Sequence, residues 1–307
     1  MNLHYYDYST YLKQKFQFKI QKISINAGMT CPNRDGRLGV GGCSFCNNLT
    51  FSPQYTHENA SIEDQVKMGV SFFSRKYKEM RFLAYFQNYT NTYAPIETLI
   101  SDYNRVLSLN NIEGLVIGTR PDCVSTDLLE YLKDVSRKKY VMIEYGVEST
   151  NDNTLSRINR HHNFETAKNI IIETAKYGIE TSAHIILGLP GENEDCMLQH
   201  ADKISFLPLK TIKLHQLQII KDTQMAKEYE NEPDKFCLFS PDNYIEFLGK
   251  FIQRLNPQIC IERFVSSSPK ELLVAPQWGL KNYEFATKLE KYLERENITQ
   301  GQYFTIK

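Results

Sequence analysis

Short apolar runs alternate with amphipathic segments over roughly the first two thirds of the chain. Strands separated by helical segments are typical of βα units, whose parallel strands share one sheet. The apolar runs predict strands over residues 22–26, 81–87, 114–118, 139–146, 180–187 and 211–219. The segments between them predict helices over residues 61–78, 95–109, 126–137, 163–177 and 193–205. Six such units predict an α/β fold, namely a partial (β/α)6 TIM-like barrel.

Residues at the expected helix ends support these bounds. Ser61, followed three positions later by Asp64, is suited to cap the first turn of the helix that begins there. Pro95 stands in the first turn of its helix, where a missing backbone N–H costs little. Gly178 follows directly after a helical segment, as expected of a residue that ends a helix.

The regular alternation stops after about Glu228. Prolines at positions 233, 241, 257, 269 and 276 interrupt the remaining chain. This part predicts helices over residues 242–255 and 283–294 and a short strand over 259–264. We therefore expect a barrel core over residues 1–228 and a mixed C-terminal extension over 229–307 that packs on the barrel.

Composition narrows the function classes. The chain has 307 residues, with 36 basic and 36 acidic side chains, which argues against a protein held to nucleic acid by its overall charge. Seven cysteines in a chain of this length do not suggest a disulfide framework. No apolar run approaches the roughly 20 residues needed to cross a bilayer, and the first residues do not resemble a secretion signal. We therefore expect a cytoplasmic protein with reduced thiols.

Three of the cysteines gather in one loop after the first predicted strand. Cys31, Cys43 and Cys46 have the spacing C-x11-C-x2-C, and five glycines surround them at positions 28, 36, 39, 41 and 42. Three thiolates can bind three irons of a cubane cluster and leave the fourth iron open to another ligand. Two alternatives are a zinc site completed by His57 and a redox pair of Cys43 and Cys46.

Three stretches together resemble one enzyme family. They are CPNRDGRLGVGGCSFCNN from Cys31, YFQNYTNTYAP from Tyr85 and GTRPDC from Gly118. They resemble radical S-adenosylmethionine (SAM) enzymes, in the group that contains the Elongator catalytic subunit, MiaB and oxygen-independent coproporphyrinogen oxidase. Within that group they are most similar to the YhcC/YtqA-like branch, and the resemblance extends to about Leu280. The first cysteine gap is longer than the common C-x3-C, as it also is in the Elongator subunit.

The resemblance implies that Cys31, Cys43 and Cys46 bind a 4Fe–4S cluster and that the open iron binds SAM. An electron from the cluster would then cleave SAM to methionine and a 5′-deoxyadenosyl radical. Phe45 would shield the cluster or contact a flat ring. The family's Gly-Gly-Glu segment after the second strand is absent, so polar side chains there are the candidates for the methionine ammonium, namely Gln87, Thr90, Asn91 and Thr92.

The fourth and fifth strands supply the remaining cofactor candidates. Glu148 stands where relatives have a glutamine and would accept from the ribose hydroxyls, while Glu144 would face the ammonium. Arg160 matches an arginine that pairs with the methionine carboxylate, a two-point contact that lysine does not reproduce. His184 would contact ribose or substrate, or would be a core residue with satisfied hydrogen bonds. Gly188 would allow the backbone to approach adenosine closely.

Cys123 is the remaining candidate catalytic residue, because it follows the third strand at the expected rim of the site. It would donate a hydrogen atom or attach to an intermediate; the alternative is a small buried apolar residue. Arg120 and Asp122 would form a loop-stabilising pair. Trp278 and Arg263 would shape the substrate end of the cavity, or Trp278 would serve packing alone.

These residues together predict a radical SAM enzyme that acts on an unidentified substrate. A small flavodoxin- or ferredoxin-like protein would supply the electron, and the cavity would exclude water. The substrate would be a nucleic acid or nucleotide, by likeness to the Elongator subunit and MiaB, or a small metabolite held under the compact extension. The alternative is a non-catalytic protein that binds zinc or a cluster.

Overall fold

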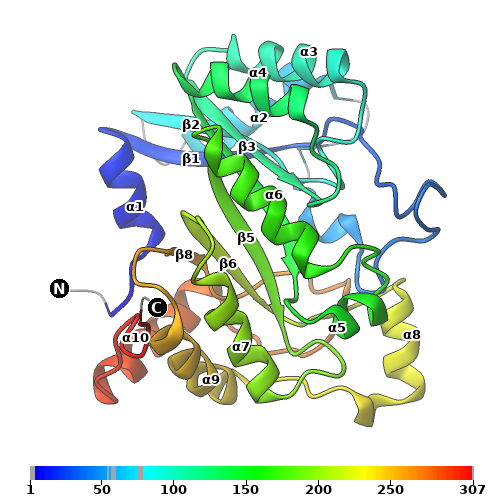
Figure 1. Cartoon of the computed structure of the whole chain (residues 1–307), viewed down its shortest axis with the longest axis vertical. Helices are drawn as coiled ribbons and strands as arrows, with labels where there is room; N and C mark the ends of the chain where they lie inside the picture. Colours follow the sequence, from blue (N-terminus) through cyan, green and yellow to red (C-terminus); the bar gives the residue numbers. More distant parts are fainter. Residues whose placement is uncertain (1–3, 54, 57–59, 75–78, 306–307) are drawn as a thin grey trace.

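The computed structural model describes residues 4–53, 55–56, 60–74 and 79–305. Seven parallel strands form its main sheet, in the order β1-β2-β3-β4-β5-β6-β8. They are β1 (Lys19–Ile25), β2 (Met80–Phe86), β3 (Ile112–Thr119), β4 (Tyr140–Glu148), β5 (Glu180–Leu187), β6 (Thr211–Gln216) and β8 (Cys260–Arg263). The sheet curls into a half-barrel whose edge strands are β1 and β8, which confirms the expected partial TIM-like fold (Figure 1).

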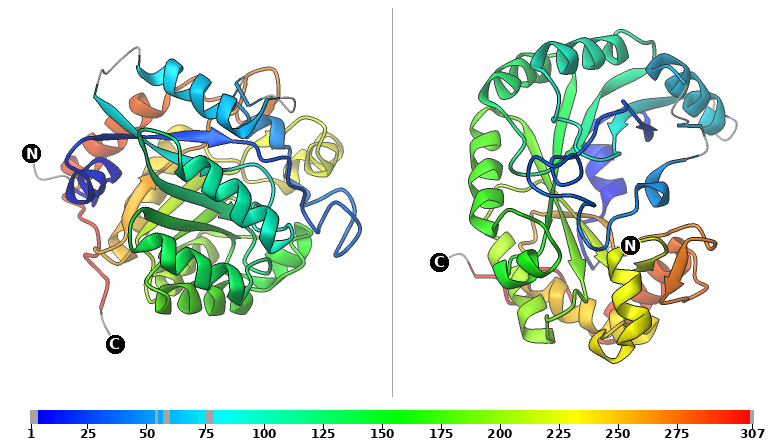
Figure 2. Two further views of the ribbon diagram at one scale, coloured as in Figure 1. Left: turned by 90° about the horizontal axis from the view of Figure 1, so that it is seen from above. Right: turned by 90° about the vertical axis from the view of Figure 1, so that its right-hand side faces the viewer.

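Helices cover the outer face of this sheet, as Figure 2 shows in the right-hand view. The helices between successive strands are α2 (Ile62–Ser74), α3 (Ile96–Leu107), α4 (Thr126–Ser136), α6 (Phe164–Lys176) and α7 (Glu194–Ile204). The last part adds α9 (Pro241–Arg254), which packs on α7, and α10 (Asn282–Arg295), which packs on α9. The expected βα alternation is therefore confirmed.

The apolar strand sequences explain why both faces of the sheet are buried. From Val141 to Val147, every residue of β4 is buried, as expected where helices cover one face and the barrel interior lies on the other. The helix-end predictions also hold. The Ser61 hydroxyl accepts from the backbone N–H of Asp64 at 3.1 Å, and Gly178 takes a left-handed φ of +75° directly after α6.

Several short elements were not predicted. They are α1 (Tyr8–Lys15), α5 (Asp152–Arg157), α8 (Gln224–Asn231), β9 (Leu273–Ala275) and the 3-10 helices η1 (Asn48–Phe51) and η2 (Pro233–Lys235). The helix α1 buries only Tyr11, so the sequence has no apolar stripe to reveal it. The predicted strand over residues 211–219 forms two strands in the structure. The first, β6, ends at Gln216, and the second, β7 (Ile219–Ile220), pairs with β9.

The C-terminal part completes the half-barrel. The predicted short strand is β8, and it pairs in parallel with β6 inside the main sheet. It also lies beside the N-terminal segment, where the Ile261 N–H donates to the Tyr6 carbonyl at 2.8 Å. The domain boundary at residue 228 stays a prediction. The C-terminal part contributes β8 to the barrel sheet, so the two predicted parts share one sheet. Among the described helices, none has the length and apolar character to cross a membrane.

Candidate functional site

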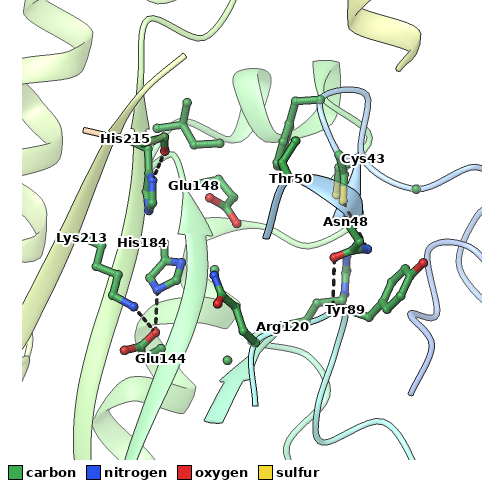
Figure 3. Close-up of a pocket in the computed structure, with 18 of the residues that line it drawn as sticks. Cys43, Asn48, Thr50, Tyr89, Arg120, Glu144, Glu148, His184, Lys213 and His215 are labelled. Atoms are coloured by element: carbon green, nitrogen blue, oxygen red, sulfur yellow. Dashed lines mark hydrogen bonds and ion pairs between the residues drawn. The ribbon is translucent and has the colours of Figure 1, made fainter. Parts of the chain in front are cut away.

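A cavity lies inside the half-barrel and extends to the carboxyl ends of its strands (Figure 3). Loops at this end carry the functional groups of parallel barrels. Ten of the predicted site residues line the cavity: Cys31, Cys43, Phe45, Cys46, Gln87, Thr90, Glu144, Glu148, Arg160 and His184. The fold thus brings together residues from the loops after β1 and β2, from β4 and β5, and from the segment after α5.

The cysteine loop, residues 31–48, is held by its own polar side chains. The Arg34 guanidinium donates to the Cys46 carbonyl at 2.8 Å and runs beside Gly42. Gly42 has a φ of +89°, and a Cβ there would lie 2.9 Å from Arg34 Nε. Glycine is therefore required by both conformation and space. The Asn33 amide donates to Cys43 Sγ at 3.4 Å and so orients a thiol.

The three thiols are free, face the same cavity and are partly or fully buried. Burial, and then the neighbouring Cys43 thiol, raise the pKa of Cys46 to about 11. Metal ligation reverses this preference, because iron binds the thiolate and releases the proton. The amide of Asn33 and the guanidinium of Arg160 already point donors at Cys43 Sγ, as expected around a negatively charged cluster.

The zinc alternative gains no support from the described residues. Within them, no three His, Cys, Asp or Glu side chains are placed to hold a single metal ion. An iron–sulfur cluster does not require its ligands to meet at one metal ion, because each thiolate binds a different iron. His57, the predicted fourth zinc ligand, lies outside the described residues.

Arg160 connects the cysteine loop to β4. Its Nη1 lies 3.5 Å from Cys43 Sγ, and its Nη2 donates to the Gly146 carbonyl at 2.5 Å and lies 3.4 Å from Glu148 Oε1. Burial lowers the pKa of Arg160, but the Cys43 thiol and Glu148 outweigh it and raise the pKa above its usual value. Its Nε is buried without a hydrogen-bond partner among the described residues. One donor therefore remains for an acidic ligand group.

A bulge at the end of β4 creates the space for this arginine. The pairing with β5 shifts between Gly146 and Glu148, and Glu148 has a φ of +66°. A Cβ on Gly146 would lie 2.5 Å from both Arg160 Nη2 and Glu148 Oε1. Gly146 thus fits the arginine against the strand backbone and directs Glu148 into the cavity.

Four residues predicted as cofactor or catalytic contacts do not line the cavity. Asn91 is fully buried and donates to the carbonyls of Phe86 and Gly118. Thr92 is bonded to the Thr119 hydroxyl and the Cys123 carbonyl. Both side chains are used to hold the loop after β2, so we correct their predicted contact with SAM.

Cys123, predicted as a catalytic residue, and Gly188, predicted to approach adenosine, also lie outside the cavity lining. The thiol of Cys123 lies 3.7 Å from Asp122 Oδ1, and burial together with that carboxylate raises its pKa to about 12. Gly188 faces Phe239 and Leu217. Arg120 and Asp122 form the expected pair through two hydrogen bonds of 2.9 and 2.8 Å.

Five charged or titratable residues inside the half-barrel form what we name the buried charge cluster: Lys22, Glu144, His184, Lys213 and Glu262. Glu144, His184 and Lys213 line the cavity described above, and Lys22 and Glu262 line a neighbouring one. Glu144 is fully buried and accepts from Lys22 at 2.8 Å, Lys213 at 2.6 Å and His184 at 3.0 Å. Figure 3 shows Lys213 and His184 directed at this carboxylate. Glu262 accepts from Lys22 at 2.7 Å. Glu144 is therefore engaged by protein cations, and its predicted contact with SAM stays a prediction.

The cluster is a mutually dependent set of charges. Burial alone would raise the pKa of Glu144, but Lys213, Lys22 and His184 hold it well below its usual range. Burial would lower the pKa of Lys22, yet Glu144 and Glu262 raise it well above its usual value. At Lys213 burial prevails and lowers the pKa. Removing any one member leaves a buried charge with one partner fewer.

Sequence reasoning missed Lys22, Lys213, His215 and Arg34 as site residues. Lys22 and Lys213 interrupt apolar strands, and a buried lysine requires a carboxylate partner. That signal, set against Glu144, would have revealed the pair. Trp278 does not line the cavity: its Nε1 donates to the Phe239 carbonyl at 2.8 Å and its ring stacks on Phe285, so it serves packing.

This chain matches known proteins along most of its length. Residues 29–204 match the radical SAM superfamily, and residues 209–295 match the radical SAM C-terminal domain. The protein YtqA of Bacillus subtilis (strain 168) is 32% identical over 300 residues, which cover 98% of this chain and 92% of the relative. The protein YhcC of Escherichia coli (strain K12) is 33% identical over 288 residues, covering 94% and 91%.

Solved structures share the fold at low identity. The archaeal Elp3 of Methanocaldococcus infernus has a TM-score of 0.67 and 14% identity, with 92% of this chain and 64% of that chain covered. This chain therefore spans about two thirds of the Elp3 chain. Methylornithine synthase (PylB) has a TM-score of 0.52 and 13% identity, covering 92% and 83%. The superfamily match and the two bacterial relatives, together with the thiols gathered at the barrel mouth, show that this chain belongs to the radical SAM superfamily.

Proposed function

We propose that this protein is a radical SAM enzyme that holds a 4Fe–4S cluster through Cys31, Cys43 and Cys46 and acts on a small molecule. The observation that carries the proposal is that three free thiols and the Arg160 guanidinium face one cavity at the carboxyl end of a half-barrel. When bound, the cluster and SAM would supply the electron transfer and the radical that start the reaction.

Unpaired buried groups in the lining support a polar cofactor beside the thiols. Arg160 Nε, Arg120 Nη1 and Thr90 Oγ1 have no hydrogen-bond partner among the described residues. Such groups are costly unless a ligand or water satisfies them. We assign Arg160 to the methionine carboxylate, Glu148 to the ribose hydroxyls and Thr90 and Gln87 to the ammonium. Phe45 would shield the cluster side of the cavity.

An external electron donor would approach at the cysteine loop. Leu38, Val40 and Leu49 expose 43%, 85% and 65% of their surface there. Exposed apolar side chains grouped on one loop favour contact with another protein. We therefore propose that a small flavodoxin- or ferredoxin-like protein docks on this loop and reduces the cluster.

The cavity interior favours a small-molecule substrate over a nucleic acid. Its deep wall carries Lys213, His184 and Glu144, which lie inside the barrel and behind the cofactor residues. A ligand must be small enough to enter in order to meet these groups. The neutral net charge gives no general attraction for nucleic acid.

The test is metal analysis of anaerobically purified protein followed by SAM cleavage with a chemical reductant. We expect about four irons and four sulfides per chain, and methionine with 5′-deoxyadenosine after reduction. Cys31→Ala should lose both the iron and the cleavage, while Cys237→Ala, at an exposed cysteine outside the cavity, should retain them. Zinc alone without cleavage would instead support a non-catalytic metal-binding protein.

A further inference from the structure

Arg263 is a cation that lines the cavity and has no partner among the described residues. It ends β8 and lines both the cofactor cavity and a second cavity between β1 and β8. Among the described residues its guanidinium makes no hydrogen bond or ion pair. An arginine that borders an internal cavity offers up to five donors, which an acidic ligand group can satisfy.

His215 adds a second unsatisfied group beside it. This residue lies on β6, the neighbour of β8, and its Nδ1 is hydrogen-bonded to the Ser266 hydroxyl. Its Nε2 is buried and has no partner within the described residues. Two adjacent strands thus direct an unpaired guanidinium and an unpaired ring nitrogen at one space.

Charge balance in this part of the cavity points to an anion. The cations are Lys22, Lys213 and Arg263, and the carboxylates are Glu144 and Glu262. The two lysines and two glutamates neutralise one another through contacts of 2.6 to 3.3 Å. One positive charge, that of Arg263, is left, and a charge facing a cavity is stabilised by an opposite charge on a ligand.

We propose that Arg263, with His215 beside it, binds an anionic group of the substrate, a carboxylate or a phosphate. The inference rests on the proposed function, because it takes the same cavity as the place of reaction. The planar guanidinium would bind two oxygens of the anion at once. The remainder of the substrate would then extend toward Glu148 and the cysteine loop, which line the same cavity.

The second cavity gives the anionic site a possible approach from the side of the barrel. The two cavities share four lining residues, Tyr85, Gln87, Lys213 and Arg263. Tyr55, Phe72 and Phe73 line the second cavity beyond them. Arg263 therefore lies where a ligand from either cavity would meet it, and aromatic walls suit an apolar or flat remainder of the substrate.

The test is direct binding of inorganic phosphate and of malonate by calorimetry. The protein is the anaerobic, cluster-loaded chain with saturating SAM, so that Arg160 is occupied. We expect saturable binding of at least one of the two anions, and the stronger of the two identifies phosphate or carboxylate as the favoured group. Arg263→Gln should weaken it at least tenfold and Arg263→Lys by a smaller factor, because lysine keeps the charge and loses the fork. Arg254→Gln, at a partly exposed arginine paired with Asp202, is the control and should bind as the unaltered protein does.

Equal binding by Arg263→Gln, or no saturable binding of either anion, overturns the inference. Because binding is read without turnover, this failure is separable from a failure of the proposed function. Full iron content and SAM cleavage without anion binding would contradict the anionic site alone. Anion binding at Arg263 by a protein that holds no iron would instead contradict the proposal that the protein is a radical SAM enzyme.

Discussion

The cysteine loop and three members of the buried charge cluster, Glu144, His184 and Lys213, line one cavity, but the chain builds the loop and the cluster in opposite ways. The three thiols lie within residues 31–46, and neighbouring side chains in the same loop hold them. The buried charge cluster takes its members from β1, β4, β5, β6 and β8, between Lys22 and Glu262. A local loop can lose its chemistry while the barrel stays folded. The buried charge cluster forms only when five strands have assembled into the half-barrel, so its loss affects folding.

The largest effect should come from the loop, on chemistry and not on folding. Cys46→Ala removes one of three thiolates, so we expect loss of the iron and of SAM cleavage down to the background rate. The free energy of unfolding of the metal-free protein should change by about 1 kcal/mol or less, because the thiol makes few contacts. Iron analysis and urea unfolding measure the two quantities. A large loss of stability without metal would erase the distinction between the regions.

Lys213→Met should have the reverse profile. It leaves the fully buried Glu144 with one cation fewer, and breaking a buried pair typically costs about 3–5 kcal/mol. We expect a corresponding fall in the urea midpoint at unchanged slope. Lys210→Met, at an exposed lysine that precedes the same strand, is the matched control. Adding Glu144→Gln to Lys213→Met should recover part of the loss, because the uncompensated charge is then absent.

Acid should weaken the same cluster. The folded pKa of Glu144 is depressed by Lys213, Lys22 and His184, so its charge stabilises the fold above the unfolded glutamate value of about 4.3. This contribution is lost as the pH falls from there toward the folded pKa. We expect the stability gap between the unaltered protein and Glu144→Gln to narrow below about pH 4.3. A gap that is constant from pH 7 downward would show that Glu144 is not charged in the folded protein.

Gly146→Ala tests the contact that Arg160 makes between the cysteine loop and β4. The added methyl would meet Arg160 and Glu148 at 2.5 Å, so the arginine must move away from Cys43. We expect SAM to bind about tenfold more weakly, the equivalent of 1.4 kcal/mol, with a modest loss of stability. Asn153→Ala, at an exposed position of α5 between Gly146 and Arg160 in the sequence, is the control for an unspecific effect of substitution in this region. Unchanged SAM affinity would remove Arg160 from the proposed binding site.

The smallest effect should come from the loop surface. Val40→Asp places a charge on a side chain that is 85% exposed, so folding should be unaffected. Reduction of the cluster by a flavodoxin- or ferredoxin-like protein should slow by roughly fivefold, about 1 kcal/mol of docking free energy. Reduction by dithionite is the control and should keep its rate. Equal slowing with both reductants would mean that the substitution disturbs the cluster itself.

The contrast also explains which features could be predicted. The βα alternation was readable because strands buried on both faces are rich in apolar residues, as in β3 and β4. The cysteine loop was readable because its ligands are close in sequence. The helix α1 was not, because it has no apolar stripe, and its place is fixed by contacts with β8, far away in the chain.

Within the site, residue type and spacing separated the predicted residues that line the cavity from those that do not. Arg160 and Glu148 were found because their spacing follows a family pattern, and both line the cavity. Asn91 and Thr92 were assigned from their polar character, which cannot tell a ligand contact from a loop-stabilising bond. The pairing of Lys213 with Glu144 arises only from strand order, since β4 and β6 are separated by β5.

The junction between residues 4–6 and the C-terminal part bears on how the chain folds. Tyr6 accepts from Ile261, and Gln300 donates its backbone N–H to His4, so the earliest residues are held by the latest. The wall that carries Glu262 and Arg263 therefore depends on contacts between segments that lie far apart along the chain. Contacts of such high sequence separation slow folding, because a long loop must be closed before they can form.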